Sequence, residues 1–152
     1  MIIWLLTHSE ELKKKTGTGK LVAEIMGSDC KIVTWSRVDP NPDIVNLSPD
    51  NSLLIYPNNN INLAESKPKP LNIENIVVID GTWQQARKMY NQSPYLKKLT
   101  HYEIKNMQSV YSKRRNQKTT GLCTAEVAIH LLNEYSHPLA PILQSRFTEF
   151  NQ

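Results

Sequence analysis

Short apolar runs alternate with longer segments of helical period along the chain. The runs that favour strands are bounded by polar or turn residues and lie at Ile2–Thr7, Lys31–Trp35, Ser52–Tyr56, Ile76–Ile79 and His101–Ile104. Segments with an apolar helical face lie at Gly19–Met26, Trp83–Asn91, Thr124–Tyr135 and Ile142–Phe150. Because nearly continuous apolar strands are separated by helices, the pattern predicts an α/β fold with a mostly parallel sheet flanked by helices.

Size and composition limit the class of protein. The chain has 152 residues, of which 39% are hydrophobic and 21% charged, and we expect one soluble domain over 1–152. No apolar run approaches the ~20 residues that a membrane-spanning helix needs. The first residues lack the features of a secretory signal peptide. Cys30 and Cys123 have no metal-ligand spacing, so we expect reduced thiols, a cytoplasmic location and no metal.

Polar motifs follow three of the predicted strands. Thr7-His8 ends the first strand, Tyr56-Pro57-Asn58 the third, and Asp80-Gly81-Thr82-Trp83 the fourth. The carboxyl ends of parallel strands share one edge of a sheet, where ligands of open α/β sheets bind. We therefore expect these three motifs to converge on one ligand.

The turn after Ile79 is chemically the richest of the three. It places the carboxylate of Asp80, the hydroxyl of Thr82 and the indole of Trp83 at the start of a helix. Helix capping explains part of this, since Asp80 and Thr82 are good N-caps and Thr82 to Gln85 fits a capping box. Capping does not require a tryptophan in the first turn.

Two further segments lead into predicted helices. The segment from Thr16 to Leu21 is rich in glycine, but it does not fit the phosphate-binding Walker pattern. Thr18 could cap the following helix, or the turn could present backbone N–H groups to a ligand. Before the long helix, Thr124 or Cys123 begins the first turn and Glu126 complements the helix dipole. Backbone N–H groups there could equally hold a ligand carboxylate.

Basic residues are concentrated in one part of the chain. Between Arg87 and Lys118 there are nine Lys and Arg against one acid, a charge of +8, whereas the net charge of the chain is +4. Tyrosines and a histidine lie among these cations. Cations that contact phosphates, together with rings that stack on bases, are typical of an RNA-binding face. An acidic protein partner is the alternative.

The chain resembles the DTW-domain proteins, a family of tRNA-uridine aminocarboxypropyltransferases. Four blocks carry the resemblance, and they cover nearly the whole chain: Leu5–His8 with Thr16–Leu21, Leu53–Pro57, Asp80–Met89 and Gly121–Glu126. Three departures stand out. The Cys-rich N-terminal segment of many members is absent, Gly17 replaces an asparagine, and Cys123 and Ala125 stand where serine and a larger apolar residue are common.

The resemblance implies a fold related to the knotted SPOUT-type RNA methyltransferases and S-adenosylmethionine as cofactor. It implies transfer of the 3-amino-3-carboxypropyl chain to N3 of a tRNA uridine, with release of methylthioadenosine. On this basis Asp80 is the expected general base, and Trp83 also lies at the reacting centre. The expected cofactor-binding residues are Thr18, Leu54, Tyr56, Pro57, Thr82, Trp83, Leu122 and Thr124. The residues expected to hold tRNA phosphates are Arg87, Lys88, Lys113, Arg114, Arg115 and Lys118.

Several alternatives stay open at the level of sequence. A methyltransferase on the same fold would use the same cofactor and move a different carbon. A non-catalytic RNA-binding module would need only the basic segment. Asp80 could pair with a ligand ammonium group or cap the helix instead of accepting a proton. The oligomeric state is also open.

Overall fold

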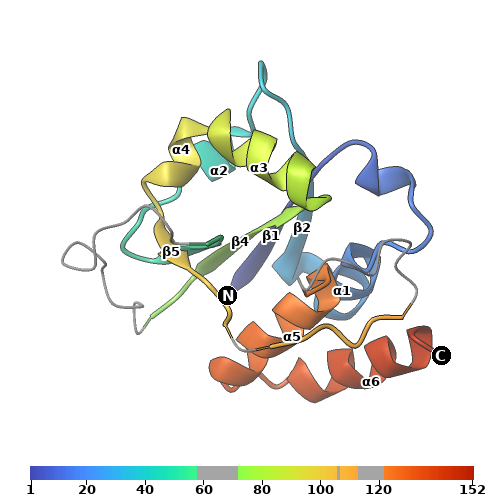
Figure 1. Ribbon diagram of the computed structural model, residues 1–152. Helices are drawn as coiled ribbons and strands as arrows, with labels where there is room; N and C mark the ends of the chain where they lie inside the picture. The colour runs from blue at the N-terminus through green and yellow to red at the C-terminus, as the bar shows by residue number, and fades with distance from the viewer. Residues whose placement is uncertain (58–71, 106, 113–121) are drawn as a thin grey trace. The chain divides into compact units, whose positions relative to one another are not determined.

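The computed structural model describes residues 1–57, 72–105, 107–112 and 122–152 (Figure 1). These residues form two compact units. The first unit comprises Met1–Lys13 and Lys31–Glu103, and the second comprises Lys14–Cys30 and Ile104–Gln152. Each unit is described by itself below.

A five-stranded sheet forms the centre of the first unit. Its strands are β1 (Ile2–Thr7), β2 (Cys30–Thr34), β3 (Ser52–Ile55), β4 (Asn75–Asp80) and β5 (Thr100–Tyr102), in the order β2-β1-β4-β3-β5. The pairs β1–β4, β3–β4 and β3–β5 are all parallel. Side chains on both faces of β1 are buried, including Ile3 and Leu5 as well as Trp4 and Leu6. Because both faces of β1 are buried, its sequence is a nearly continuous apolar run.

Three helices lie on one face of this sheet: α2 (Pro42–Val45), α3 (Trp83–Asn91) and α4 (Pro94–Lys97) (Figure 1). Their apolar side chains meet those of the strands in one core. The core consists of Trp4, Leu6, Ile44, Leu47, Leu54, Val77, Met89, Leu96 and Leu99. A short 3-10 helix, η1 (Glu11–Lys13), follows β1.

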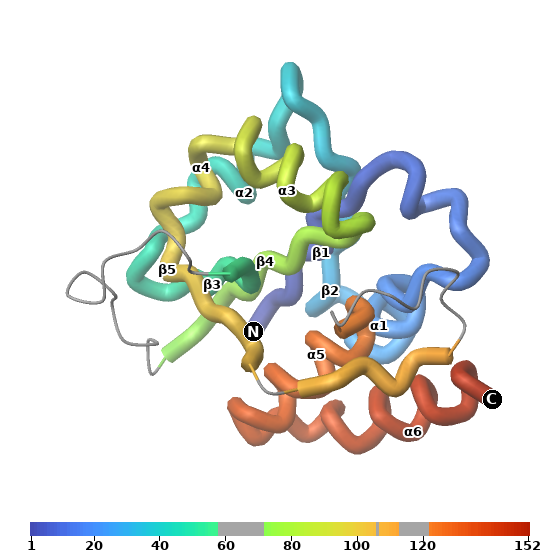
Figure 2. Tube along the Cα trace, in the orientation of Figure 1, coloured from blue at the N-terminus to red at the C-terminus, as the bar shows by residue number. Residues whose placement is uncertain are grey.

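The second unit is helical. It contains α1 (Gly19–Met26), the 3-10 helix η2 (Gly27–Asp29), α5 (Thr124–Glu134) and α6 (Ala140–Phe150), and α1, α5 and α6 pack against one another (Figure 2). Leu21 and Val22 of α1, Leu131 and Leu132 of α5, and Phe147 of α6 are almost completely buried. The Arg146 guanidinium bonds the Glu24 carboxylate at 3.2 Å and so links α6 to α1 at the surface.

The structure confirms the predicted class and most of the predicted elements. The bounds of β1, α1 and α3 are those expected, whereas α6 begins two residues earlier than predicted, at Ala140. The segment between β2 and β3, in which the sequence pattern predicts no helix, contains α2. Asn41 starts this helix: its side-chain oxygen accepts hydrogen bonds from the N–H groups of Asp43 and Ile44. Most of the segment from Pro57 to Pro70, between β3 and β4, lies outside the described residues.

A substitution at Leu54 tests the packing of the core, because the Leu54 side chain is fully buried between the sheet and the helices. We expect Leu54→Ala to lower the free energy of unfolding by about 2–5 kcal/mol, from lost burial and the resulting cavity. Urea denaturation measures this. Leu12→Ala is a matched control, since Leu12 is 40% exposed. Equal losses in the two variants would contradict the packing described.

Candidate functional site

The ends of β1 and β4 lie side by side at the centre of the sheet. Thr7 is in register with Asp80, and the His8 N–H donates a hydrogen bond to the Asp80 backbone carbonyl at 2.9 Å. The chain leaves β1 toward β2 on one side and leaves β4 toward β5 on the other. This divergence makes the β1–β4 boundary the topological switch point, where open α/β sheets bind ligands.

The third polar motif joins the same edge. Ile55, the last residue of β3, pairs with Val78, so Tyr56 and Pro57 follow at the level of the end of β4. The Tyr56 N–H also donates to the Tyr102 carbonyl, at 3.1 Å. Thr7, His8, Tyr56, Pro57 and the Asp80–Trp83 turn therefore lie at one edge of the sheet, as predicted, and their convergence on one ligand stays a prediction. Asn58 lies outside the described residues.

Helix α3 is capped by Thr82. Its hydroxyl accepts from the Gln85 N–H at 3.2 Å, and the Gln85 side-chain oxygen accepts from the Thr82 N–H at 2.9 Å. The predicted capping box is therefore present. The N-cap residue of α3 is therefore Thr82 and not Asp80. Only 9% of Asp80 is exposed, although it ends a strand.

Gly81 is needed for close packing of this turn. A Cβ at this position would lie 3.1 Å from Gln85 Oε1 and 3.2 Å from Gln85 Cβ, and 3.5 Å from the Cβ of His8. The Gln85 amide is itself fixed, since it donates to the Glu10 carboxylate at 2.8 Å. A larger residue would therefore disturb the capping box beside Asp80.

Three aromatic rings form a column next to the turn. Tyr56 lies between Trp83 and Tyr90: its ring centroid is 6.2 Å from that of Trp83 and 4.0 Å from that of Tyr90, with interplanar angles of 18° and 12°. We call Trp83, Tyr56 and Tyr90 the aromatic column. Tyr56 and Tyr90 pack on the core, whereas 53% of Trp83 is exposed. The column thus runs from the core to a largely uncovered indole.

His101, on β5, fixes the inner end of the column. Its Nδ1 lies 2.8 Å from the Leu99 carbonyl oxygen and its Nε2 lies 2.7 Å from the Tyr90 hydroxyl. A carbonyl can only accept, so Nδ1 carries the proton and, in the neutral ring, Nε2 accepts from Tyr90. The two rings also meet edge to face, at 5.6 Å.

The environment keeps the tyrosines and thiols protonated. Burial raises the pKa of Tyr56, against a smaller lowering by Arg87, and burial followed by the neighbouring Tyr56 raises the pKa of Tyr90. Burial raises the pKa of Cys30 to about 11 and that of Cys123 to about 12. None of these groups is therefore suited to accept a proton, or to act as a thiolate, near neutral pH.

Cations border the column on its helical side. Arg87 and Lys88 of α3, Lys97 of α4 and Lys98, which follows α4, are exposed. The Lys97 ammonium lies 5.7 Å from the centroid of the Tyr90 ring, and that of Lys98 donates to the Val45 carbonyl at 2.7 Å. The other predicted phosphate contacts, Lys113, Arg114, Arg115 and Lys118, lie outside the described residues.

Three of the predicted cofactor residues, Thr18, Leu122 and Thr124, belong to the second unit. Thr18 is the N-cap residue of α1, but its side chain makes no cap hydrogen bond. Its buried hydroxyl instead accepts from the Ala125 N–H at 3.0 Å, at the start of α5. The Cys123 N–H donates to Glu126 at 3.0 Å. Two N–H groups at this helix start are therefore already bonded within the unit.

The remaining predicted residues divide by exposure. Thr82 and Trp83 are exposed, and Tyr56 and Pro57 are partly buried at the same edge. Leu54 is fully buried in the core, so its side chain supports the site from behind. The sequence pattern counted Tyr90 and His101 among the rings of the basic segment but did not place them at this edge, because only the pairing of β5 with β3 brings His101 there.

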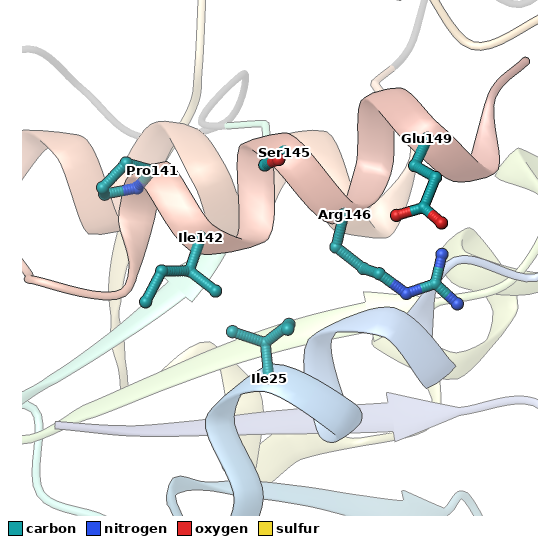
Figure 3. Close-up of a pocket in the computed structure, with 6 residues that line it drawn as sticks. All are labelled: Ile25, Pro141, Ile142, Ser145, Arg146 and Glu149. Carbon is teal, nitrogen blue, oxygen red and sulfur yellow. The ribbon is translucent and has the colours of Figure 1, made fainter.

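A separate hollow lies on the second unit (Figure 3). It is open, has a volume of about 420 Å³, and is lined by Ile25, Pro141, Ile142, Ser145, Arg146 and Glu149. The side chains of Ile25 and Ile142 face each other across it (Figure 3). Arg146 already pairs with Glu24, so the hollow offers little for chemistry.

The described residues contain no group of three or more His, Cys, Asp or Glu side chains that could hold a metal ion. In the same part of the chain, no helix has the length and apolar character needed to span a membrane.

A comparison with protein families matches residues 1–151 to the DTW domain. The chain belongs to the DTW domain family. Membership of this family is consistent with a tRNA-modifying activity. No solved structure matches the chain.

The second unit of this DTW domain contains a carboxylate with three hydrogen-bond donors. Glu126 accepts from the Ser109 hydroxyl at 2.5 Å, the Val110 N–H at 2.9 Å and the Cys123 N–H at 3.0 Å. Burial alone would raise the pKa of Glu126, but these hydrogen bonds outweigh it, so its pKa lies below the usual 4.5.

The lowered pKa predicts a dependence of stability on pH. The stabilisation by Glu126 is complete above its unfolded-state pKa and is lost as pH falls through the lower folded-state value. At pH 7 we expect Glu126→Gln to lower the free energy of unfolding by about 1–2 kcal/mol, with the difference from the parent shrinking below about pH 4.5. Urea denaturation from pH 7 to pH 3 measures it.

Glu149→Gln is the control, since Glu149 is exposed and should change stability by less than about 0.5 kcal/mol. A difference between Glu126→Gln and the parent that stays constant over this pH range would contradict the assignment.

Proposed function

We propose that this DTW domain transfers the 3-amino-3-carboxypropyl group of S-adenosylmethionine to N3 of a tRNA uridine and releases methylthioadenosine. Asp80 carries the proposal: it is a nearly buried carboxylate at the topological switch point, three residues before the exposed Trp83. Family membership supplies the expected reaction class. We also propose that the fold is related to the SPOUT-type RNA methyltransferases and that the protein acts in the cytoplasm.

The residue types at this edge suit the cofactor. The adenine of the cofactor and the base of uridine are both flat rings, and Trp83 and Tyr56 offer aromatic faces to such rings. When bound, S-adenosylmethionine supplies an electrophilic carbon attached to a positively charged sulfur. Aromatic faces attract such a cation, and Asp80 could also pair with the ammonium group. Thr18, Leu122 and Thr124 stay predicted contacts of the same cofactor.

The principal chemical task of the protein is to remove a proton. Uridine N3–H is a weak acid, and N3 must lose its proton as it bonds to the transferred carbon and as the carbon–sulfur bond breaks. Tyr56, Tyr90 and the two cysteines hold their own protons at neutral pH. Asp80 is therefore assigned as the general base.

The second task is orientation. Attack succeeds at the sulfonium-bound carbon that faces N3 in line, so the geometry of binding decides which group moves. The capping box of Thr82 and Gln85 and the packing around Gly81 hold the turn that carries Asp80 and Trp83. These contacts would keep the base and the indole in fixed positions relative to the substrate.

Asp80→Asn tests the proton transfer. The variant keeps the size of the side chain and loses its basicity, so we expect turnover to fall at least about a hundredfold with cofactor affinity largely unchanged. Release of methylthioadenosine in the presence of tRNA measures turnover, and calorimetry measures affinity. Asp39→Asn is the control, because Asp39 is exposed. Near-normal turnover in Asp80→Asn would remove Asp80 from this role.

Lys88→Ala tests the RNA-binding side. Lys88 is exposed on α3, so losing one phosphate contact should reduce the slope of log affinity for tRNA against log salt by about 1. Lys31→Ala is the matched control. Lys31 lies over the Trp4 ring and belongs to β2, which is the strand at the other end of the sheet from β5. We expect the salt dependence of tRNA binding by Lys31→Ala to match that of the parent. Equal slopes for Lys88→Ala and the parent would place the RNA elsewhere.

A further inference from the structure

The outer end of the aromatic column is an open platform. Trp83 is the first residue of α3 and is 53% exposed, although indole is among the largest apolar groups a protein has. Its centroid lies 6.2 Å from that of Tyr56, well beyond the ~3.5 Å of full face-to-face contact, so much of the indole surface is not covered by that ring.

The inner part of the column is firmly held. Tyr90 stacks on Tyr56 at 4.0 Å, bonds His101 through its hydroxyl and has the Lys97 ammonium near its ring. His101 is anchored in turn by the Leu99 carbonyl. A planar group that stacks on Trp83 would therefore extend an already ordered stack, which limits the entropy lost on binding.

The charge around the column favours one class of ligand. Helices α3 and α4 contain three cations, Arg87, Lys88 and Lys97, and no acid, and a fourth cation, Lys98, follows directly after α4. A polyanion is attracted. Small-molecule sites also enclose most of their ligand, whereas open aromatic platforms beside cations are typical of single-stranded nucleic-acid binding.

We propose that Trp83 stacks an unpaired nucleobase of the RNA substrate, at or beside the target uridine, while Arg87 and Lys88 contact the flanking phosphates. This inference rests on the proposed function for the identity of the RNA as tRNA. Every base has a stacking face, so the platform selects unpaired nucleotides over a duplex and discriminates little by sequence.

The test uses two RNA probes with the full chain. One is a single-stranded oligouridylate and the other a fully paired RNA duplex of the same length. Trp83→Ala should weaken binding of the single strand about tenfold or more, with the affinity for the duplex within about twofold of the parent's, because phosphate contacts remain. Trp83→Phe keeps an aromatic face and should recover most of the lost affinity. Lys88→Ala should weaken both probes alike.

Calorimetry with S-adenosylmethionine separates this inference from the proposed function. The inference predicts that Trp83→Ala lowers the affinity for the single strand by a larger factor than the affinity for S-adenosylmethionine. Loss of cofactor affinity with unchanged binding of the single strand would overturn it and assign the indole to adenine, and the proposed reaction would stand. The protein could bind the single strand through Trp83 and still form no modified uridine. That result would support the stacking role of Trp83 and reject the proposed transfer reaction. A Trp83→Phe variant as weak as Trp83→Ala would also overturn the stacking role.

Discussion

The site depends on the parallel pairing of β1 with β4 through their last residues. This pairing puts Thr7 beside Asp80 and lets the His8 N–H bond the Asp80 carbonyl. The chain then leaves the two strands in opposite directions, which opens the edge of the sheet at this point. The backbone of Asp80 is held by the sheet, and the Thr82 cap starts α3 two residues later. A slip of one residue in this register would turn Asp80 to the other face of the sheet.

The aromatic column connects this edge to the hydrophobic core. Tyr56 and Tyr90 pack on the core residues of β3 and α3, so the position of the column follows from the packing of α3 on the sheet. The Tyr90–His101 hydrogen bond then ties α3 to β5, on the far side of β3. Core packing, the cap of α3 and the exposed indole are thus parts of one arrangement, in which each limits the freedom of the next.

Much of the fold and part of the site could be predicted from the sequence. The strands β1, β3 and β4 were evident because most of their side chains are buried, and α3 because Thr82 and Gln85 form a recognisable capping box. The convergence of Tyr56 and Asp80 followed from the rule that parallel strands end at one edge. The role of His101 could not be predicted, because it depends on which strand β5 joins. The hydrogen bond from the Ala125 N–H to the Thr18 hydroxyl could not be predicted, because a contact between residues so far apart in the sequence leaves no local signal.

The most direct test of the account is mass spectrometry of nucleosides from unmodified tRNA incubated with the protein and S-adenosylmethionine. The account predicts a uridine heavier by one 3-amino-3-carboxypropyl group, in step with release of methylthioadenosine. A uridine heavier by a methyl group, with release of S-adenosylhomocysteine, would contradict it and assign the chain to methyl transfer. An unmodified uridine in tRNA that the protein binds would contradict it as well and favour an RNA-binding role without catalysis.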